Sequence, residues 1–310
     1  MKRRQALKTI GAAAGLTAAM PSAALSGQTR RGSSGDRPEA GPPMTAKKTV
    51  RLITAALILC GALLSATPAG RAPSDFTINS RILEEDRSIR VTLPERYGIE
   101  ETSYPMLILL DAESDDAYRK AAVVLERLEA AGEGPGMILI GIRNTIRNRD
   151  MIPAAVAHRP GSGGSEHFLR FIREELLPDI RSRFRTAGPT LLYGASNAGL
   201  FTVYAMLESP ETFDAAIASS PMIGHCPDLM REKAAAFRRK ELPGRRVLYM
   251  IYGTQDSRRV TEYLPDYQAA LSAGAPREFQ SETVIVEGEG HVPPDSLIRG
   301  LRFVFQRIGF

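Results

Sequence analysis

The sequence predicts a mostly parallel α/β sheet of about eight strands, covered by helices on both faces. The first observation is that the middle and later apolar runs are nearly continuous, as strands buried on both faces must be. The second is that segments with helical periodicity separate these runs, and parallel strands need such crossover connections. The third is the composition of the 310 residues, 43% hydrophobic and 24% charged, which is typical of a globular protein.

Eight apolar runs are the expected strands. They span residues 76–83, 88–93, 106–110, 137–142, 190–193, 215–218, 247–252 and 283–286. The first two runs alternate apolar and polar residues, which favours an antiparallel pair at a partly solvated edge of the sheet. The expected helices span residues 115–131, 165–183, 196–207, 229–240, 261–273 and 294–308. No linker-like stretch follows residue 75, so residues 71–310 are predicted to form one domain.

The positive charge of the chain lies in its first 70 residues. The formal net charge is +5, but residues 1–70 contain ten of the 40 Lys and Arg and two of the 35 Asp and Glu. Residues 71–310 therefore carry 30 basic and 33 acidic residues, a net charge of −3. Because a nucleic-acid-binding domain is usually basic, this balance disfavours a nucleic-acid partner.

Residues 1–70 are predicted to be an export leader. Basic residues at 2–8 precede the weakly apolar run 10–20, an arrangement that resembles a twin-arginine export signal. The same pattern starts again at Met44, where basic residues precede the apolar run 52–66. A genuine double leader beginning at Met1 stays open beside the simpler account that Met44 is the true start.

The second apolar run has the length of a signal peptide. Its 15 residues are fewer than the ~20 that span a bilayer, and small residues follow it, so residues 44–69 are typical of a cleaved signal. An uncleaved anchor is the alternative. We expect cleavage between about residues 66 and 74 and a periplasmic or secreted protein without stable membrane association. Only Cys226 would then remain, so no intramolecular disulfide is expected.

A short apolar strand runs directly into a helix at Gly194-Ala195-Ser196-Asn197-Ala198. The small residues on either side of Ser196 allow a sharp turn in which strand and helix approach closely. Such a turn exposes the Ser196 hydroxyl at a helix N-terminus and points the Asn197 amide at a developing oxyanion. The pattern indicates a nucleophile elbow, and an ordinary serine N-cap is the alternative.

Four histidines are available as the general base of such a serine. His158 and His167 precede Ser196, and His225 closely follows a predicted strand. His291 lies just after the last strand and before the last helix, where an α/β sheet with the order Ser, acid, His places its base. A solvated loop histidine is the alternative interpretation of His291.

The candidate acid is Asp256. It follows the strand 247–252, and catalytic groups gather at the carboxyl ends of the strands in open α/β sheets. Glu262 is the substitute, and an N-cap or surface aspartate is the alternative interpretation of Asp256.

Several segments in order resemble the putative esterase family of α/β-hydrolases, which includes enterochelin esterases, feruloyl esterases and esterase D. Residues 79–83 and 87–97 are similar to the first hairpin of the family, 104–111 to its oxyanion strand, and 147–153 to a later loop. Residues 163–165, Phe168 and residues 175–178 match the helix before the elbow. The order and spacing of these segments carry the resemblance.

The resemblance implies an α/β-hydrolase fold with Ser196 as nucleophile, His291 as general base and Asp256 as the orienting acid. It also implies an oxyanion hole made by the backbone amides of Asn197 and Glu113.

The chain departs from the family pattern at two positions. Ala112 stands where the family usually has Gly, and Ala198 replaces the second Gly of the elbow. Some enterochelin-type members resemble a Ser–His dyad, so whether the acid is Asp256, Glu262 or absent stays open.

Together these features predict an exported serine hydrolase that cleaves a carboxylic ester through an acyl-enzyme, with a siderophore lactone or a feruloylated or acetylated saccharide as substrate. The alternative is a catalytically weak α/β-hydrolase-like protein that binds a ligand or a partner. The sequence contains no metal-ligand spacing, no GxGxxG and no P-loop, so neither a metal nor a cofactor is expected. The particular ester and the oligomeric state stay open.

Overall fold

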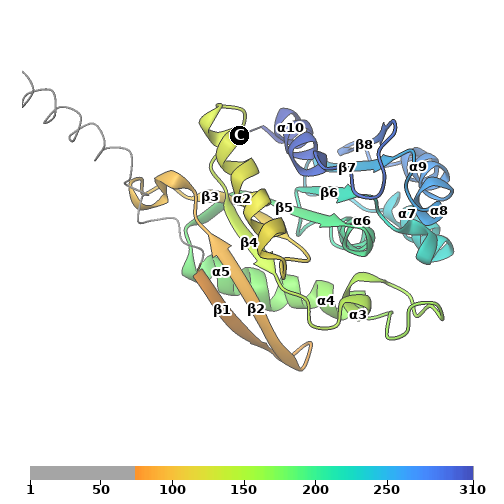
Figure 1. Cartoon of the computed structure of the whole chain (residues 1–310), viewed down its shortest axis with the longest axis horizontal. Helices are drawn as coiled ribbons and strands as arrows, with labels where there is room; N and C mark the ends of the chain where they lie inside the picture. The colour runs from red at the N-terminus through yellow and green to blue at the C-terminus, as the bar shows by residue number, and fades with distance from the viewer. Residues whose placement is uncertain (1–73, 310) are drawn as a thin grey trace, which may run out of the picture. The chain divides into compact units, whose positions relative to one another are not determined.

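Eight strands form one sheet in the computed structural model, which describes residues 74–309 (Figure 1). Across the sheet the strands are β1 (Ser74–Ser80), β2 (Glu85–Thr92), β4 (Ile138–Ile142), β3 (Tyr104–Leu109), β5 (Thr186–Ala195), β6 (Ala215–Ser219), β7 (Arg246–Gly253) and β8 (Phe279–Val286). β2 runs antiparallel to both of its neighbours, and the strands from β4 to β8 are mutually parallel. The predicted mostly parallel sheet with an antiparallel edge pair is confirmed.

The described residues fall in one compact unit. The predicted export leader, residues 1–70 with its signal-like part 44–69, lies outside the described residues. Within residues 74–309, no helix is both long and apolar enough to cross a membrane.

Helices connect the parallel strands, and the last helix, α10, follows the last strand. They are α2 (Asp115–Ala130), α3 (Arg147–Met151), α4 (Ser165–Phe171), α5 (Leu177–Arg183), α6 (Asn197–Glu208), α7 (Pro227–Phe237), α8 (Arg258–Thr261), α9 (Leu264–Ser272) and α10 (Ser296–Ile308). Two short 3-10 turns, η1 (Glu95–Gly98) and η3 (Ile223–His225), complete the connections.

The expected helices are present with two corrections. The expected helix 165–183 is continuous but contains a π-helical turn, η2 (Ile172–Leu176), between α4 and α5. The expected helix 261–273 begins later, at Leu264, as α9, because Pro265 lacks an N–H and suits the first turn of a helix; the four-residue α8 precedes it as a separate helix. The five-residue α3 is an addition to the expected set, since it is too short to show a helical period.

Successive residues of the central strands face opposite sides of the sheet. Leu192 of β5 packs in a cluster that includes residues of α4, α6, α7 and α9. The preceding Leu191 packs in a second cluster with residues of α2 and α10. Both faces of the sheet are therefore buried, as the continuous apolar runs predict.

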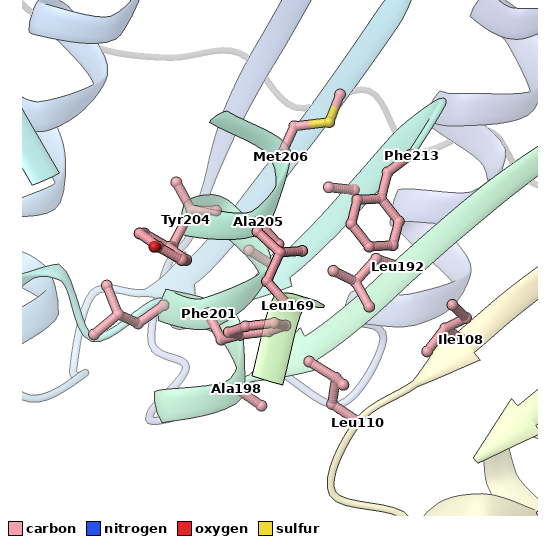
Figure 2. Close-up of a cluster of buried hydrophobic side chains, with 14 of the residues drawn as sticks. Ile108, Leu110, Leu169, Leu192, Ala198, Phe201, Tyr204, Ala205, Met206 and Phe213 are labelled. Atoms are coloured by element: carbon pink, nitrogen blue, oxygen red, sulfur yellow. The ribbon is translucent and has the colours of Figure 1, made fainter. Parts of the chain in front are cut away.

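Helix α6 is enclosed by the larger cluster. Every residue of α6 from Asn197 to Leu207 is buried. Figure 2 shows Phe201, Ala205 and other α6 side chains near Ile108 of β3 and Leu192 of β5. Because a close-packed interior resists shifts of its parts, the N-terminus of α6 is held firmly at the end of β5.

Candidate active site

Strained backbone gathers at the carboxyl ends of the parallel strands. Among residues 74–309, five non-glycine residues have a φ between 47° and 61°: Glu84, Asp111, Ser196, Ser220 and Val292. Glu84 lies between β1 and β2, whereas the other four follow β3, β5, β6 and β8. L-residues rarely adopt positive φ, and such strain tends to cluster at functional sites. The same edge of an open α/β sheet is where ligands bind.

Ser196 occupies the predicted sharp turn between β5 and α6. Its φ of 61° and ψ of −120° are outside the regions that L-residues prefer, and its N–H donates to the carbonyl oxygen of Ser219 over 2.9 Å. A Cβ on Gly194 would lie 2.4 Å from the carbonyl oxygen of Ala198, so the approach of helix to strand requires glycine there. The Ser196 hydroxyl makes no capping hydrogen bond to α6, contrary to the N-cap alternative.

The structure brings Ser196, His291 and Asp256 together in one hydrogen-bonded chain. His291 Nε2 lies 2.9 Å from Ser196 Oγ, and His291 Nδ1 lies 2.6 Å from Asp256 Oδ1. The Asp256 side chain is fully buried, whereas that of His291 is 41% exposed. The chain therefore runs from a buried carboxylate to a hydroxyl at the surface, in the order that nucleophilic acyl transfer requires.

Asp256 is held in its charged form. Burial alone would raise the pKa of this carboxyl, but hydrogen bonding with His291, the nearby Ser220 hydroxyl and the Ser257 amide outweigh it, so the pKa lies below its ordinary value. The Ser257 N–H donates to Oδ1 over 2.6 Å. The other oxygen, Oδ2, is buried and has no hydrogen-bond partner among the described residues.

Hydrogen bonds to residues that follow the neighbouring strands hold the loop that contains His291 in place. The Val292 N–H donates to Ser220 Oγ over 2.8 Å, which joins two residues with positive φ. The Gln255 N–H donates to the carbonyl oxygen of Glu289 over 2.9 Å, and a Cβ on Gly253 would lie 2.0 Å from that same oxygen. The loops after β6, β7 and β8 thus position the imidazole jointly.

The other candidates of the sequence lie elsewhere. Glu262, the substitute acid, pairs with Arg258 on the surface at 2.5 Å rather than with His291. His167 is exposed on α4. His158 and His225 contact each other and not the Ser196 hydroxyl.

The loop after β3 is fixed by residues that follow β4. The Asp111 carboxylate accepts hydrogen bonds from the Arg147 guanidinium, over 3.0 Å from Nε and 2.7 Å from Nη2, and from the Asn144 amide over 2.5 Å. The Ala112 N–H donates to the carbonyl oxygen of Ile142. The backbone N–H groups of Glu113 and Asn197 donate to no group of residues 74–309, so both are available to an oxyanion.

Several residues of this site escape sequence reasoning. Asn144 and Arg147 fix the loop after β3, and Ser220 holds Val292. The signal for Ser220 is its place directly after a buried strand, as for Ser196. Within residues 74–309, no group of three or more His, Cys, Asp or Glu side chains is arranged to hold a metal ion.

A protein-family model described as "Putative esterase" matches residues 80–294 of the chain. Ferri-bacillibactin esterase BesA of Bacillus subtilis is 27% identical over 232 residues, which cover 66% of this chain and 80% of that protein. The siderophore triacetylfusarinine C esterase of Aspergillus fumigatus is 28% identical over 158 residues, covering 46% of this chain and 54% of that protein.

A solved structure with a similar fold is that of an IroE-like serine hydrolase from Shewanella oneidensis. It superposes with a TM-score of 0.67 at 26% identity, over 76% of this chain and 80% of that one. The range matched by the family model contains the elbow and the loops that carry Asp256 and His291.

Proposed function

The chain belongs to the putative esterase family and is a carboxylic ester hydrolase with an α/β-hydrolase fold, and from this premise we propose that it is an exported serine esterase that cleaves a siderophore ester. The relatives from Bacillus subtilis and Aspergillus fumigatus, both named as siderophore esterases, support this substrate class. We assign Ser196 as nucleophile, His291 as general base and Asp256 as the acid behind the base.

The observation that carries the proposal is the unbroken chain from Asp256 through His291 to Ser196. Its two contacts of 2.6 and 2.9 Å lie within hydrogen-bond reach without any rearrangement. Because the charged Asp256 accepts from Nδ1, the imidazole presents an unprotonated Nε2 to the Ser196 hydroxyl.

Acylation follows from this arrangement. Ser196 Oγ attacks the ester carbonyl carbon while its proton passes to His291 Nε2, and the carbonyl oxygen becomes an oxyanion held by the Asn197 and Glu113 amides. The tetrahedral intermediate then collapses: the bond to the leaving alkoxide breaks, and the alkoxide takes the proton from His291. Asp256 stabilises the imidazolium between these two transfers.

Deacylation repeats the same steps with water. His291 Nε2 removes a proton from a water molecule that attacks the acyl carbon, and the second tetrahedral intermediate releases the carboxylic acid product. The proton returns to Ser196 Oγ, which restores the free enzyme.

The openness of the site supports a bulky substrate. The His291 side chain is 41% exposed and its bond to Ser196 lies at the surface. A large macrocyclic or metal-bound ester can therefore reach the hydroxyl without passing through a narrow channel.

Two measurements test the assignment of the enzyme and its nucleophile. An activated fluorophosphonate should label Ser196, as read by peptide mapping, and the enzyme should hydrolyse siderophore lactones faster than p-nitrophenyl acyl esters or feruloyl sugars. Ser196→Ala should abolish labelling and turnover, whereas Ser182→Ala, which changes an exposed serine of α5, should keep both. A chain that binds siderophore but is neither labelled nor active would instead be the ligand-binding protein considered above.

Export rests on the leader pattern in residues 1–70. We propose cleavage between about residues 66 and 74 and release of the domain 71–310 into the periplasm or medium. N-terminal sequencing of the exported protein tests this, and a mature N-terminus upstream of residue 44 or recovery in the membrane pellet would contradict it.

A further inference from the structure

A second hydrogen-bonded chain of side chains reaches the elbow from the other side. His158 Nε2 lies 2.8 Å from His225 Nδ1, and His225 Nε2 lies 3.0 Å from Asn197 Oδ1. His225 and Asn197 are each only 4% exposed, whereas His158 is at the surface. The ester chemistry described above uses neither imidazole.

The acceptor at the end of this chain, Asn197 Oδ1, determines which ring nitrogens carry a hydrogen. Asn197 Oδ1 can only accept, so His225 carries its hydrogen on Nε2. A neutral ring then has an unprotonated Nδ1, which accepts the hydrogen of His158 Nε2. Burial, together with the positive charges of Arg159 and Arg259, lowers the pKa of His225 to about 4, which keeps the ring neutral near pH 7.

The His225 segment is also tied to the backbone of the elbow. The Met222 N–H, one turn before His225, donates to the carbonyl oxygen of Ser196 over 3.3 Å, and the His225 N–H donates to Met222 over 3.0 Å. The Arg259 guanidinium donates to the carbonyl oxygen of Gly224 over 3.1 Å. The η3 turn is thus fixed on α8 and on the peptide that joins Ser196 to Asn197.

Asn197 has two roles in this geometry. Its backbone N–H is one of the two amides assigned to the oxyanion, and its side-chain oxygen accepts the hydrogen bond from His225. Because an amide must point at the developing charge to stabilise it, the orientation of this residue bears on the transition state more than on the bound ester.

Resting on the proposed function, we propose that His225 is a positioning residue for ester hydrolysis: it holds the Asn197 side chain, and so aims the Asn197 backbone N–H at the oxyanion. His158 supports the same ring from the loop between α3 and α4. Removing one oxyanion donor typically lowers kcat by about 10²–10³-fold. A change in the orientation of the Asn197 N–H, with the donor still present, should therefore lower kcat by about 10- to 100-fold.

Three substitutions of His225 distinguish the role of Nε2, which contacts Asn197, from that of Nδ1, which contacts His158. His225→Gln can place an amide N–H near the position of Nε2 and keep the bond to Asn197, so its kcat should stay within about threefold of the parent. His225→Asn can reach only the position of Nδ1 and His225→Leu has no donor, so both should lose the 10- to 100-fold in kcat with KM changed less than about threefold. His158→Ala should have a smaller effect, about threefold, because it leaves the bond to Asn197 in place.

A tetrahedral inhibitor reports on the oxyanion separately from substrate binding. The inhibition constant of an aryl trifluoromethyl ketone, which forms an oxyanion adduct with Ser196, should rise in His225→Leu by the factor lost in kcat/KM and stay near the parental value in His225→Gln. His167→Leu, a change of an exposed histidine on α4, serves as the control and should alter neither quantity.

The outcomes are distinct. If Ser196→Ala is inactive and His225→Leu keeps the parental kcat and inhibition constant, the positioning role is refuted while the proposed function stands. A raised KM with an unchanged inhibition constant would make His225 a substrate-binding residue and likewise refute the proposal. Should His225→Leu fail to fold by circular dichroism, a kcat loss in the folded His225→Asn variant decides the question. Full turnover by Ser196→Ala would overturn both the function and this role.

Discussion

Replacing Asp256 by Asn separates a Ser–His–Asp triad from a Ser–His dyad. In the triad, Asp256 stabilises the imidazolium that forms when Ser196 gives its proton to His291. In a dyad, the same carboxylate would be a bystander, and its charge would not affect turnover. The buried side chain and the 2.6 Å contact with His291 Nδ1 favour the triad.

The surroundings of Asp256 determine how far kcat should fall in Asp256→Asn. The Ser257 N–H at 2.6 Å from Oδ1 requires an acceptor, so the oxygen of the new carboxamide should stay there and still accept from His291 Nδ1. The imidazole tautomer is then kept and only the charge is lost. Two unit charges ~4 Å apart at an effective dielectric constant of ~20 interact by about 4 kcal/mol, or about three powers of ten in rate. Because His291 is partly solvated, we expect kcat to fall by about 10²–10³ and KM to change little.

The assay is steady-state hydrolysis of any ester that the parent cleaves, at neutral pH, with folding verified by circular dichroism. Glu262→Gln is the matched control: Glu262 pairs with Arg258 on the surface, so its loss should leave kcat within about twofold. A fall of less than about fivefold in Asp256→Asn would reject Asp256 as the acid and the triad with it. A fall of about 10⁴, as occurs in serine proteases when this substitution stabilises the wrong imidazole tautomer, would refute the predicted orientation of the carboxamide.

Three further predictions concern the nucleophile, the elbow and the buried imidazole. Ser196→Ala and His291→Ala should each remove nearly all turnover, and the double variant should be no worse, because the pair acts as a unit; additive losses would contradict this. Gly194→Ala should lower the free energy of unfolding by about 1–3 kcal/mol, since its Cβ would meet the Ala198 carbonyl, whereas Gly98→Ala, which meets open space, should cost less than about 0.5 kcal/mol by urea denaturation. The pKa of His225 is about 4 in the folded protein, below its ordinary value of 6.5, so the unfolded chain binds a proton first as the pH falls. The free energy of unfolding of the parent should therefore fall by roughly 3 kcal/mol between pH 7 and 4, and His225→Gln should lack this loss. Equal pH dependence of the two proteins would refute it.

Most of the fold could be predicted from the sequence because two periodicities carry it. Strands buried on both faces produce continuous apolar runs, and the edge strands β1 and β2 produce alternation. The π-helical turn in 165–183 has no such signature, because the helical period continues through it. The start of α9 does have a signal in Pro265, because proline is favoured in the first turn of a helix.

The short α3 depends on contacts that are distant in sequence. Its Asp150 is fully buried and pairs with Arg87 of β2, and the Asp150 carbonyl accepts from Ser165 of α4. A five-residue segment has too few turns for a hydrophobic period, so its helical form is decided by tertiary structure.

Ser196, Asp256 and His291 could be predicted to meet because each follows the end of a parallel strand, and these ends gather at one edge of the sheet. The contacts that orient them have no such rule. Val292 and Ser220 are 72 residues apart, His158 and His225 are 67 apart, and His225 and Asn197 are 28 apart. These pairs depend on the exact course of loops, which local sequence does not specify.

The strained residues of the site are held by groups from other strand ends. Val292 after β8 is bound by Ser220 after β6, Ser196 after β5 is bound by the last residue of β6, and Asp111 after β3 is gripped by Arg147 after β4. Each positive φ costs on the order of 1–3 kcal/mol, which favours relaxation of the loop that contains it. No loop can relax alone, however, because its movement would also break a hydrogen bond or ion pair of its neighbour. The buried α6 and the two-sided core fix the strand ends themselves, so the hydrogen-bonded arrangement of Ser196, His291 and Asp256 is maintained by the whole sheet and not by these three residues alone.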